Sequence, residues 1–147
     1  MLGHFATGVA LITGMHDGRP AGLTCQSFFS LSLDPPMVAL APGRKSTSWP
    51  RVASTGTFCA NVLASDQEPL ARTFAESGAD KFAGVGWSPG ANRAPRLHGA
   101  LAWIECTIEN TFETGDHYLV VAGVDEVEVG SGQPLLFYRG GFGGFTS

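Results

Sequence analysis

The sequence contains few basic residues and few charged residues of either sign. Lysine and arginine together number 9, against 13 aspartates and glutamates, and the formal net charge is -4. Nucleic-acid binding depends on clustered lysine and arginine side chains that contact phosphates, whereas here these residues are scattered along the chain. The composition therefore argues against a nucleic-acid partner.

Long apolar runs and cysteine pairs are also missing. No segment approaches the ~20 apolar residues of a membrane-spanning helix, and the N-terminus lacks the basic-then-apolar pattern of a signal peptide. Cys25, Cys59 and Cys106 lie far apart and form no C-x-x-C pair, which argues against a disulfide framework and against a zinc site. We therefore expect a cytoplasmic protein without membrane association and without a bound metal.

Self-contained catalytic and nucleotide-binding motifs are absent as well. No serine lies in a G-x-S-x-G elbow, and no two histidines have metal-ligand spacing. The segment GRKST at 43–47 has Arg44 where a P-loop requires glycine before the lysine, and it lacks the first glycine of that motif. The glycines at 84 and 86 lack the third glycine of a dinucleotide fingerprint. Both nucleotide-binding loops are excluded.

Glycine, phenylalanine and apolar residues in general are plentiful. The chain has 147 residues, of which 44% are apolar, with 20 glycines and 10 phenylalanines. This length suits one ordinary domain with a real core, so we read 1–147 as a single domain. The composition is typical of many strands joined by tight turns.

The first half of the chain predicts a hairpin, a third strand and two helices. Residues 5–14 (FATGVALITG) read as a buried strand, the turn HDGRP at 16–20 returns the chain over 21–27, and MVALA at 37–41 forms the next strand. A short helix is expected over 50–54 and a strand over 58–63. Ser65 and Glu68 have capping-box spacing before a helix expected over 66–77.

The second half predicts further antiparallel strands. Residues 81–96 read as a long ordered loop, 97–111 alternate as a half-buried strand, 117–129 return, and 134–138 form a last strand before a tail of glycine and aromatic residues at 139–145. The sum is six or seven strands with one good helix and one short helix. Two helices are too few to cover a parallel sheet. We therefore expect a mainly β, antiparallel fold, and a small barrel in preference to a sandwich.

A polar stretch interrupts the apolar pattern at 22–36 (GLTCQSFFSLSLDPP). Thr24, Ser27 and Ser30 carry hydroxyls, and Cys25 and Gln26 carry other polar side chains. Each buried hydroxyl or amide costs about 1 to 3 kcal/mol unless it finds a hydrogen bond, so this run suits the binding of a polar ring system. An edge strand entering a serine-rich turn fits the same residues equally well.

A second polar run, RKSTSW at 44–49, precedes the short helix. Side-chain donors of Arg44, Lys45, Ser46, Thr47 and Ser48 would lie beside the unpaired N–H groups of a helix start, where anions bind favourably. An ordinary capped surface helix is the alternative.

One histidine stands apart from the other three. His117 follows Gly115-Asp116 at the mouth of a predicted hairpin, where an imidazole can reach a pocket and titrate near neutral pH. Because the chain shows polar groups but no catalytic set of its own, a bound flavin could carry the reaction while the protein binds and orients it.

Six segments together resemble the short-chain flavin reductase family, the reductase components of two-component flavin-dependent monooxygenases. In chain order they are FATGVALIT, GLTCQSFFSLSLDPP, FCANVL, the pair Lys81-Phe82, GDHYLVVAGV and PLLFYRGGF. The resemblance implies an FMN-binding split β-barrel and a homodimer with flavin near the subunit interface. It also implies reduction of FMN or FAD by NADH or NADPH, and a monooxygenase component as a transient partner.

The resemblance also implies roles for individual residues. The loop that hydrogen-bonds the flavin ring edge matches Thr24, Cys25, Gln26, Ser27 and Phe28. The region that meets the phosphate and ribityl chain matches Lys45, Ser46 and Thr47. Asn61 matches the strand flanking the flavin, Phe82 the loop near it, His117 a residue associated with nicotinamide binding, and Tyr138 to Phe142 the C-terminal wall.

The sequence departs from the family pattern in two places. Family members commonly have Ala-Asn where this chain has Cys25-Gln26, so the amide side chain is one carbon longer. The chain also starts close to the first motif, whereas relatives usually carry a short helical lead, and we expect a trimmed or late start.

Three hypotheses follow for the function. The first is an NAD(P)H:flavin oxidoreductase, and the second is a non-catalytic flavin- or haem-binding module on the same barrel. The third is a hydrolase or thiol enzyme that uses Cys25 or Cys59.

Overall fold

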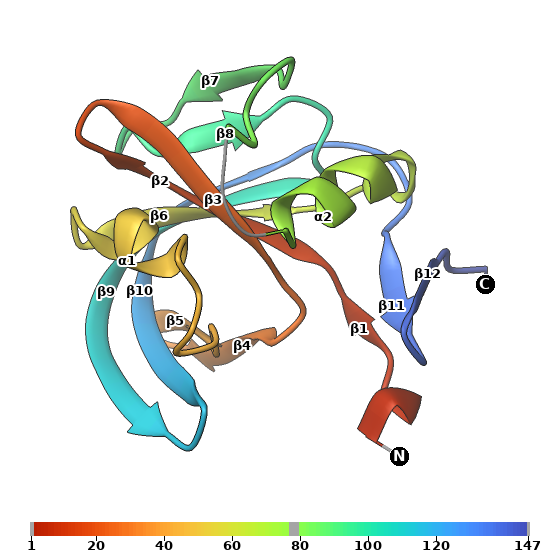
Figure 1. Ribbon diagram of the computed structural model, residues 1–147, viewed down its shortest axis with the longest axis horizontal. Helices are drawn as coiled ribbons and strands as arrows, with labels where there is room; N and C mark the ends of the chain where they lie inside the picture. Colours follow the sequence, from red (N-terminus) through yellow and green to blue (C-terminus); the bar gives the residue numbers. More distant parts are fainter. Residues whose placement is uncertain (1, 77–79, 147) are drawn as a thin grey trace.

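The main element of the structure, a computed structural model that describes residues 2–76 and 80–146, is a seven-stranded antiparallel sheet (Figure 1). Its strands in sheet order are β3 (Arg19–Cys25), β2 (Ala10–His16), β6 (Thr57–Val62), β9 (Ala102–Thr114), β10 (His117–Val129), β5 (Pro36–Leu40) and β4 (Phe28–Leu33). All neighbouring pairs run antiparallel. The expected mainly β, antiparallel fold is confirmed.

Smaller elements surround this sheet. Two short helices, α1 (Trp49–Ala53) and α2 (Glu68–Phe74), and two 3-10 turns, η1 (Leu2–His4) and η2 (Ser65–Gln67), lie outside it. The strands β7 (Trp87–Pro89) and β8 (Pro95–Leu97) pair with each other. The strands β1 (Thr7–Gly8), β11 (Leu136–Tyr138) and β12 (Gly141–Gly143) form a three-stranded sheet that extends away from the main body near both chain ends (Figure 1).

The predicted first hairpin is confirmed, with β2 and β3 paired from Ala10 opposite Cys25 to His16 opposite Arg19. The turn between them is Asp17-Gly18, and both residues have positive φ, 50° and 75°. Aspartate followed by glycine is the pair that tolerates such angles in a two-residue turn, and this turn matches the twist of the flanking strands.

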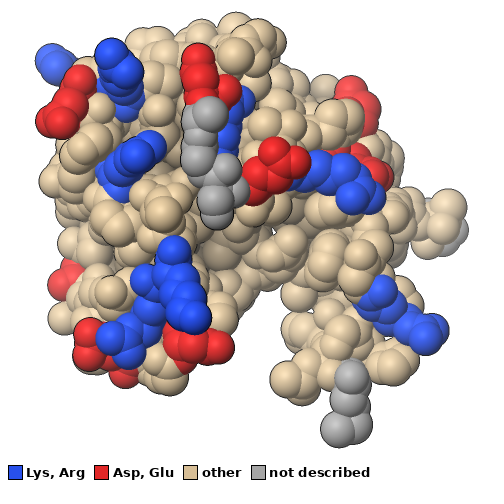
Figure 2. Space-filling view, viewed as in Figure 1, with Lys and Arg blue, Asp and Glu red and all other residues tan. Residues whose placement is uncertain are grey.

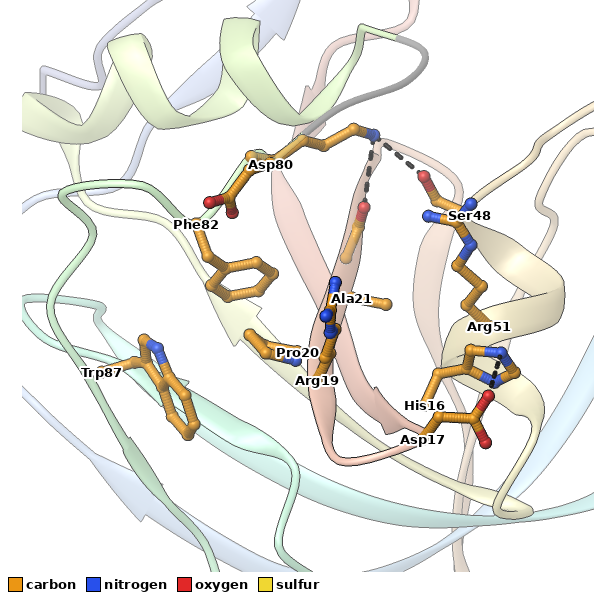
Figure 3. Close-up of a pocket in the computed structure, with 12 residues that line it drawn as sticks. His16, Asp17, Arg19, Pro20, Ala21, Ser48, Arg51, Asp80, Phe82 and Trp87 are labelled. Carbon is orange, nitrogen blue, oxygen red and sulfur yellow. Dashed lines mark hydrogen bonds and ion pairs between the residues drawn. The ribbon is translucent and has the colours of Figure 1, made fainter.

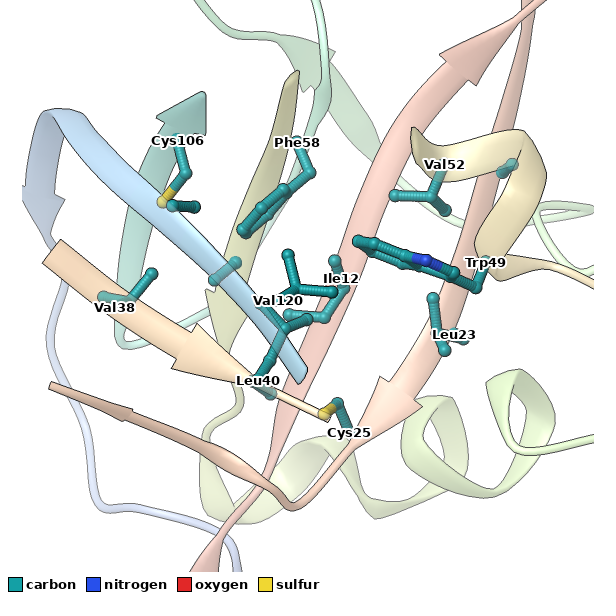
Figure 4. Close-up of a cluster of buried hydrophobic side chains, with 14 residues drawn as sticks. Ile12, Leu23, Cys25, Val38, Leu40, Trp49, Val52, Phe58, Cys106 and Val120 are labelled. Carbon is teal, nitrogen blue, oxygen red and sulfur yellow. The ribbon is translucent and has the colours of Figure 1, made fainter. Parts of the chain in front are cut away.

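The seven-stranded sheet curls on itself into a barrel. Leu23 of β3, near one edge of the sheet, and Leu40 of β5, near the other edge, belong to one buried cluster together with Val120 of β10 (Figure 4). Trp49 and Val52 of α1 pack against the same cluster. No ladder joins β3 to β4 among the described residues, so the barrel is split between these two strands.

A second buried cluster covers the outer face of β2. Leu11 points away from the barrel interior, where it packs with Phe74 of α2 and with Phe82 and Leu97 of the segment that follows α2. Ile12, its neighbour, points into the barrel. Both faces of β2 are therefore buried, which explains why its sequence is apolar without alternation.

Some local expectations are corrected by the structure. Residues 28–33 form the edge strand β4, so the edge-strand reading of the polar stretch holds there and Phe28 is not in a loop. The segment expected as one loop contains the pair β7 and β8, and the C-terminal tail contains β12. The helix expected over 66–77 begins as η2, and its α-helical part ends at Phe74; Ser77 lies outside the described residues. The capping hydrogen bond runs from the N–H of Ala64, the N-cap of η2, to Oε1 of Gln67, so it lies one residue before the expected box of Ser65 and Glu68.

A buried carboxylate anchors the far side of the barrel. Glu105 of β9 is 1% exposed and accepts hydrogen bonds from the backbone N–H of Asn92, at 2.7 Å, and from the Arg96 guanidinium. Arg96 also pairs with Glu126 and Glu128. Burial raises the pKa of Glu105, but the Asn92 and Arg96 hydrogen bonds outweigh it and hold that pKa below its ordinary value.

Because the pKa of Glu105 is lowered in the folded state, its contribution to stability is present at neutral pH and is lost as the pH falls below about 4.3 toward the lowered value. We expect Glu105→Gln to reduce the free energy of unfolding by about 3 kcal/mol at pH 7, because it breaks a buried ion pair. The difference from the wild type should shrink at pH 3.5.

Urea unfolding at the two pH values measures this effect, with Glu109→Gln on the exposed part of the same strand as the control, expected within about 0.5 kcal/mol of the wild type. A Glu105→Gln deficit that is the same at both pH values would contradict the assignment.

Candidate functional site

A narrow groove of about 230 Å³ lies beside the split of the barrel. Three parts of the chain that are distant in sequence line it: the end of β3 with the residue after it, the segment before α1, and the end of α2 with Lys81. The lining residues are Leu23, Thr24, Gln26, Gly43, Ser46, Thr47, Ser48, Phe74, Ala75, Glu76 and Lys81. The structure thus brings together four of the predicted cofactor-binding residues, namely Thr24, Gln26, Ser46 and Thr47.

The residues of the predicted ring-binding loop, at and after the end of β3, do not all face the groove. Thr24 lines the groove, and its Oγ1 donates to the carbonyl of Ala71 at 2.6 Å, which ties β3 to α2. Gln26 also lines the groove, and no hydrogen bond of its amide is found within the described residues. Gln26 is therefore the residue of this loop with free polar atoms at the groove.

The alternate residues of the same loop point elsewhere. Cys25 is buried in the barrel interior, and its thiol lies 3.3 Å from the Ser27 hydroxyl. Ser27 Oγ donates to the carbonyl of Ala41 and accepts the N–H of Ala41, so it joins the connection after β3 to the residue that follows β5. Phe28 packs against the barrel cluster. Cys25, Ser27 and Phe28 therefore do not line the groove.

The three cysteines are poor nucleophiles. All of them are buried and free. Burial raises the pKa of Cys25 and of Cys106, and burial with the nearby Glu105 carboxylate raises the pKa of Cys59 to about 12. Since the thiolate is the reactive form, the structure argues against the thiol-enzyme hypothesis.

The segment before α1 contributes side chains to the groove, and its helix contributes little. The helix has only five residues, and Ser48 at its N-cap makes no side-chain cap. Ser46 Oγ instead accepts the N–H of Trp49 at 3.1 Å, which leaves fewer free N–H groups than expected. Thr47 lines the groove and is exposed, whereas Lys45 is exposed and lies outside it.

Lys81 is the groove residue that sequence reasoning missed. Its Nζ donates to Ser48 Oγ at 2.9 Å and to the carbonyls of Phe74 at 3.1 Å and Gly22 at 3.4 Å. Burial lowers the pKa of Lys81, and the nearby Arg51 lowers it further. The only signal in the sequence was its place in the pair Lys81-Phe82, which gives no hint that three distant segments meet at its ammonium group.

A larger cleft of about 910 Å³ adjoins the groove, and Ser48 and Lys81 line both (Figure 3). Phe82, predicted to lie near the cofactor, is buried and lines this cleft. Its ring packs edge-on against Phe74, with centroids 4.8 Å apart, and against Trp87, with centroids 6.3 Å apart.

The structure also brings His117 close to one end of the groove. His117, the first residue of β10, forms a β-bridge with Gly43, and the N–H of Arg44 donates to the carbonyl of Asp116 at 2.9 Å. His117 Nδ1 lies 2.6 Å from Asp116 Oδ1, and this hydrogen bond lowers the pKa of the exposed Asp116. The hairpin tip and the segment before α1 are thus held side by side.

The remaining predicted residues lie away from the groove. Asn61 is fully buried, where its Nδ2 donates to the Leu11 carbonyl at 2.9 Å and its Oδ1 accepts the N–H of Leu97 at 2.8 Å. Tyr138 lies in β11, and Phe142 lies in β12 with the Arg72 guanidinium 5.0 Å from its ring centroid. Both polar atoms of the Asn61 side chain thus have partners in the core, and its role beside a cofactor stays a prediction.

Two searches of the described residues gave negative results. None of the helices is long and apolar enough to cross a membrane. No group of three or more histidine, cysteine, aspartate or glutamate side chains in 2–76 and 80–146 is arranged to hold a metal ion.

Comparisons with known proteins agree on one family. Residues 2–146 match the model of the flavin reductase like domain. A flavin reductase of Pseudomonas putida is 44% identical over 149 residues, covering 100% of this chain and 88% of that protein. The reductase subunit HsaB of a flavin-dependent monooxygenase of Mycobacterium tuberculosis is 42% identical over 147 residues, covering 98% of this chain and 79% of that protein.

Solved structures show the same likeness. Nitrilotriacetate monooxygenase component B from Mycobacterium thermoresistibile superposes with a TM-score of 0.95 at 41% identity, covering 99% of this chain and 83% of that one. The NADH:FAD oxidoreductase SgcE6 of Streptomyces globisporus, in complex with NAD and FAD fragments, superposes with a TM-score of 0.93 at 35% identity, covering 99% and 88%.

The buried position of Asn61 predicts a structural role. Asn61→Ala leaves the N–H of Leu97 without its partner in the core, and we expect the free energy of unfolding to fall by about 3 kcal/mol. Urea unfolding measures the loss, with Asn110→Ala at an exposed position of β9 as the control. Unchanged stability combined with weaker flavin binding would instead support the predicted role of Asn61 in cofactor binding.

Proposed function

The chain belongs to the flavin reductase-like family, and on this premise we propose that it is an NAD(P)H:flavin oxidoreductase that supplies reduced FMN or FAD to a separate flavin-dependent monooxygenase. The observation that carries the proposal is the groove at the barrel split, where Gln26, Thr47 and Lys81 from three segments meet close to His117. Relatives named as flavin reductases and as reductase subunits of monooxygenases support it.

The groove residues fit the parts of a flavin. The free amide of Gln26 carries both donor and acceptor atoms, as the edge of an isoalloxazine ring requires. The hydroxyl of Thr47 and the ammonium group of Lys81 also line the groove and suit the ribityl chain and the phosphate. A bound flavin supplies the hydride-accepting chemistry that the side chains lack.

The protein's own contribution is binding and orientation. Lys81 joins β3, the segment before α1 and the end of α2, so the walls of the groove are held at fixed separations. The backbone bridge between His117 and Gly43, a groove residue, supports a role for the His117 imidazole in positioning a nicotinamide against the flavin. Holding two reactants in register removes the entropic cost of bringing them together during the reaction.

Steady-state assays test the proposal directly. Oxidation of NADH and of NADPH should accelerate when the protein is supplied with FMN, FAD or riboflavin, measured side by side. Flavin binding without any nicotinamide oxidation would contradict the proposal and favour the non-catalytic flavin- or haem-binding module.

Two substitutions should separate nicotinamide use from flavin binding. His117→Ala should raise the KM for the nicotinamide more than tenfold while the flavin Kd changes little, because His117 lies at the hairpin tip beyond the groove. Thr47→Val should instead weaken flavin binding by about 1 kcal/mol through loss of one hydrogen bond. Stopped-flow titrations and steady-state kinetics give the constants; equal losses in both for His117→Ala would point to a hairpin-stabilising role.

We also propose that the protein is a homodimer. The extension that carries η1, β11 and β12 exposes large apolar side chains, with Leu2 90% and Phe5 81% exposed, and such a patch is what a second copy would cover. Sedimentation equilibrium that finds only monomer at micromolar concentration would rule this out.

Three buried, free cysteines support a cytoplasmic location, where thiols stay reduced.

A further inference from the structure

The tip of the β9–β10 hairpin, residues 109–119, carries His117 and has little sheet beside it. β5 pairs with β10 only from Val120 onward, and β6 pairs with β9 only as far as Thr107. Residues 109–117 are all exposed, and Figure 1 shows the turn of this hairpin projecting beyond β4 and β5. A two-stranded hairpin without neighbours is at best marginally stable in water. Contacts from outside the sheet are therefore needed to hold the tip in place.

The segment after β5 supplies backbone contacts to the tip. The N–H of Tyr118 donates to the carbonyl of Pro42 at 2.9 Å, and the N–H of Arg44 donates to the carbonyl of Asp116 at 2.9 Å. Together with the β-bridge at His117, these bonds place the segment alongside the tip like a short third strand. They are main-chain bonds, so they do not depend on which side chain stands at position 44.

The side chain of Arg44 adds three contacts to the same tip. Its Nη1 donates to the carbonyl of Gly115 at 3.3 Å, and its Nη2 lies 3.5 Å from Glu113 Oε1. Its guanidinium carbon lies 5.9 Å from the centroid of the Tyr118 ring. The side chain of Arg44 is 44% exposed and that of Glu113 is 69% exposed, so the ion pair alone is weak. A guanidinium can make all three contacts at once, because its nitrogens form a planar fork whose face packs on a ring.

Arg44 itself is not a residue of the binding surface. Its neighbours Gly43 and Ser46 line the groove, whereas Arg44 lines neither the groove nor the larger cleft. Figure 2 shows basic side chains flanked by acidic ones over the hairpin tip and the segment before α1. The sequence places Arg44 among the donors for an anion at the start of α1, but the structure pairs its guanidinium with Glu113. Arg44 can therefore act on the site only through the tip that it contacts.

We propose that Arg44 is a positioning residue for His117, which clamps the hairpin tip and so holds the imidazole where it meets the nicotinamide. This inference rests on the proposed function and deepens it. Gly115 has a φ of 65°, which glycine accepts readily at the first position of a two-residue turn. The carbonyl that Arg44 binds thus belongs to a tight turn that ends at His117. Asp116 fixes the orientation of the ring through its 2.6 Å contact with Nδ1, and Arg44 fixes the place of the turn.

Hydrogen exchange followed by mass spectrometry tests the clamp without turnover. Amides in peptides that cover 109–119 should exchange about threefold faster in Arg44→Gln than in the wild type, because the tip opens more often. Arg44→Lys keeps the charge without the planar fork and should lie between the two. The control is Arg93→Gln, which removes the same charge from the exposed turn between β7 and β8 and should leave these peptides unchanged. Unchanged exchange in Arg44→Gln would overturn the clamp.

Steady-state kinetics and flavin titrations test the effect on His117. Arg44→Gln should raise the KM for NADH or NADPH about fivefold, the upper end for losing an exposed ion pair, and should leave the flavin Kd unchanged. In protein that already carries His117→Ala, the same substitution should have no further effect on that KM, because a positioning residue acts only through the imidazole. A rise in KM that persists in the His117→Ala background would make Arg44 a direct ligand of the nicotinamide dinucleotide and would overturn the proposal. A higher flavin Kd with an unchanged KM would overturn it as well.

Failure of this inference can be told from failure of the proposed function. A protein that oxidises NADH or NADPH with a flavin, but whose KM is the same in Arg44→Gln, keeps the function and loses the positioning role. A protein that oxidises no nicotinamide loses the function, and the exchange measurement alone then decides whether Arg44 clamps the hairpin tip.

Discussion

The structure depends on one constraint of chain continuity, which is that β3 and β4 are the two edges of the sheet and are also consecutive strands. The chain passes from one edge to the other through Gln26 and Ser27 alone, so the sheet curls but the two edges do not pair. Ser27 bonds both backbone groups of Ala41, which fixes this connection to the β4–β5 side of the split. The polar residues of this connection are therefore present because an unpaired sheet edge requires hydrogen-bond partners and leaves room for a ligand.

The split also explains how one short segment has two functions. Side chains that alternate along the end of β3 place Thr24 at the groove and Cys25 in the barrel interior. Lys81 then closes the groove from the opposite side by joining three segments at one ammonium group. These contacts link segments up to 59 positions apart in sequence. The walls of the groove therefore come from segments whose local sequences do not indicate that they meet.

Charge is distributed unequally over the molecule. The far side of the barrel holds a partly buried Arg96 that forms ion pairs with three glutamates. Arg19 and Arg51 beside α1 line the cleft and form no ion pair in the described residues, although Asp17 and Asp80 line the same cleft.

The sequence by itself determined the fold class, the Asp17-Gly18 hairpin and the family, because apolar patterning, turn residues and ordered motifs are local properties of the chain. The family motifs also placed Thr24, Gln26, Ser46 and Thr47 in one predicted site, and the structure brings these four residues to one groove. Only the tertiary structure showed that Asn61 is buried and hydrogen-bonds two neighbouring segments, that Lys81 lines the groove, and that the larger cleft adjoins it. Those facts depend on contacts between strands and helices that are distant in the sequence. Local sequence patterns do not specify such contacts, because they form only when the sheet curls into the barrel.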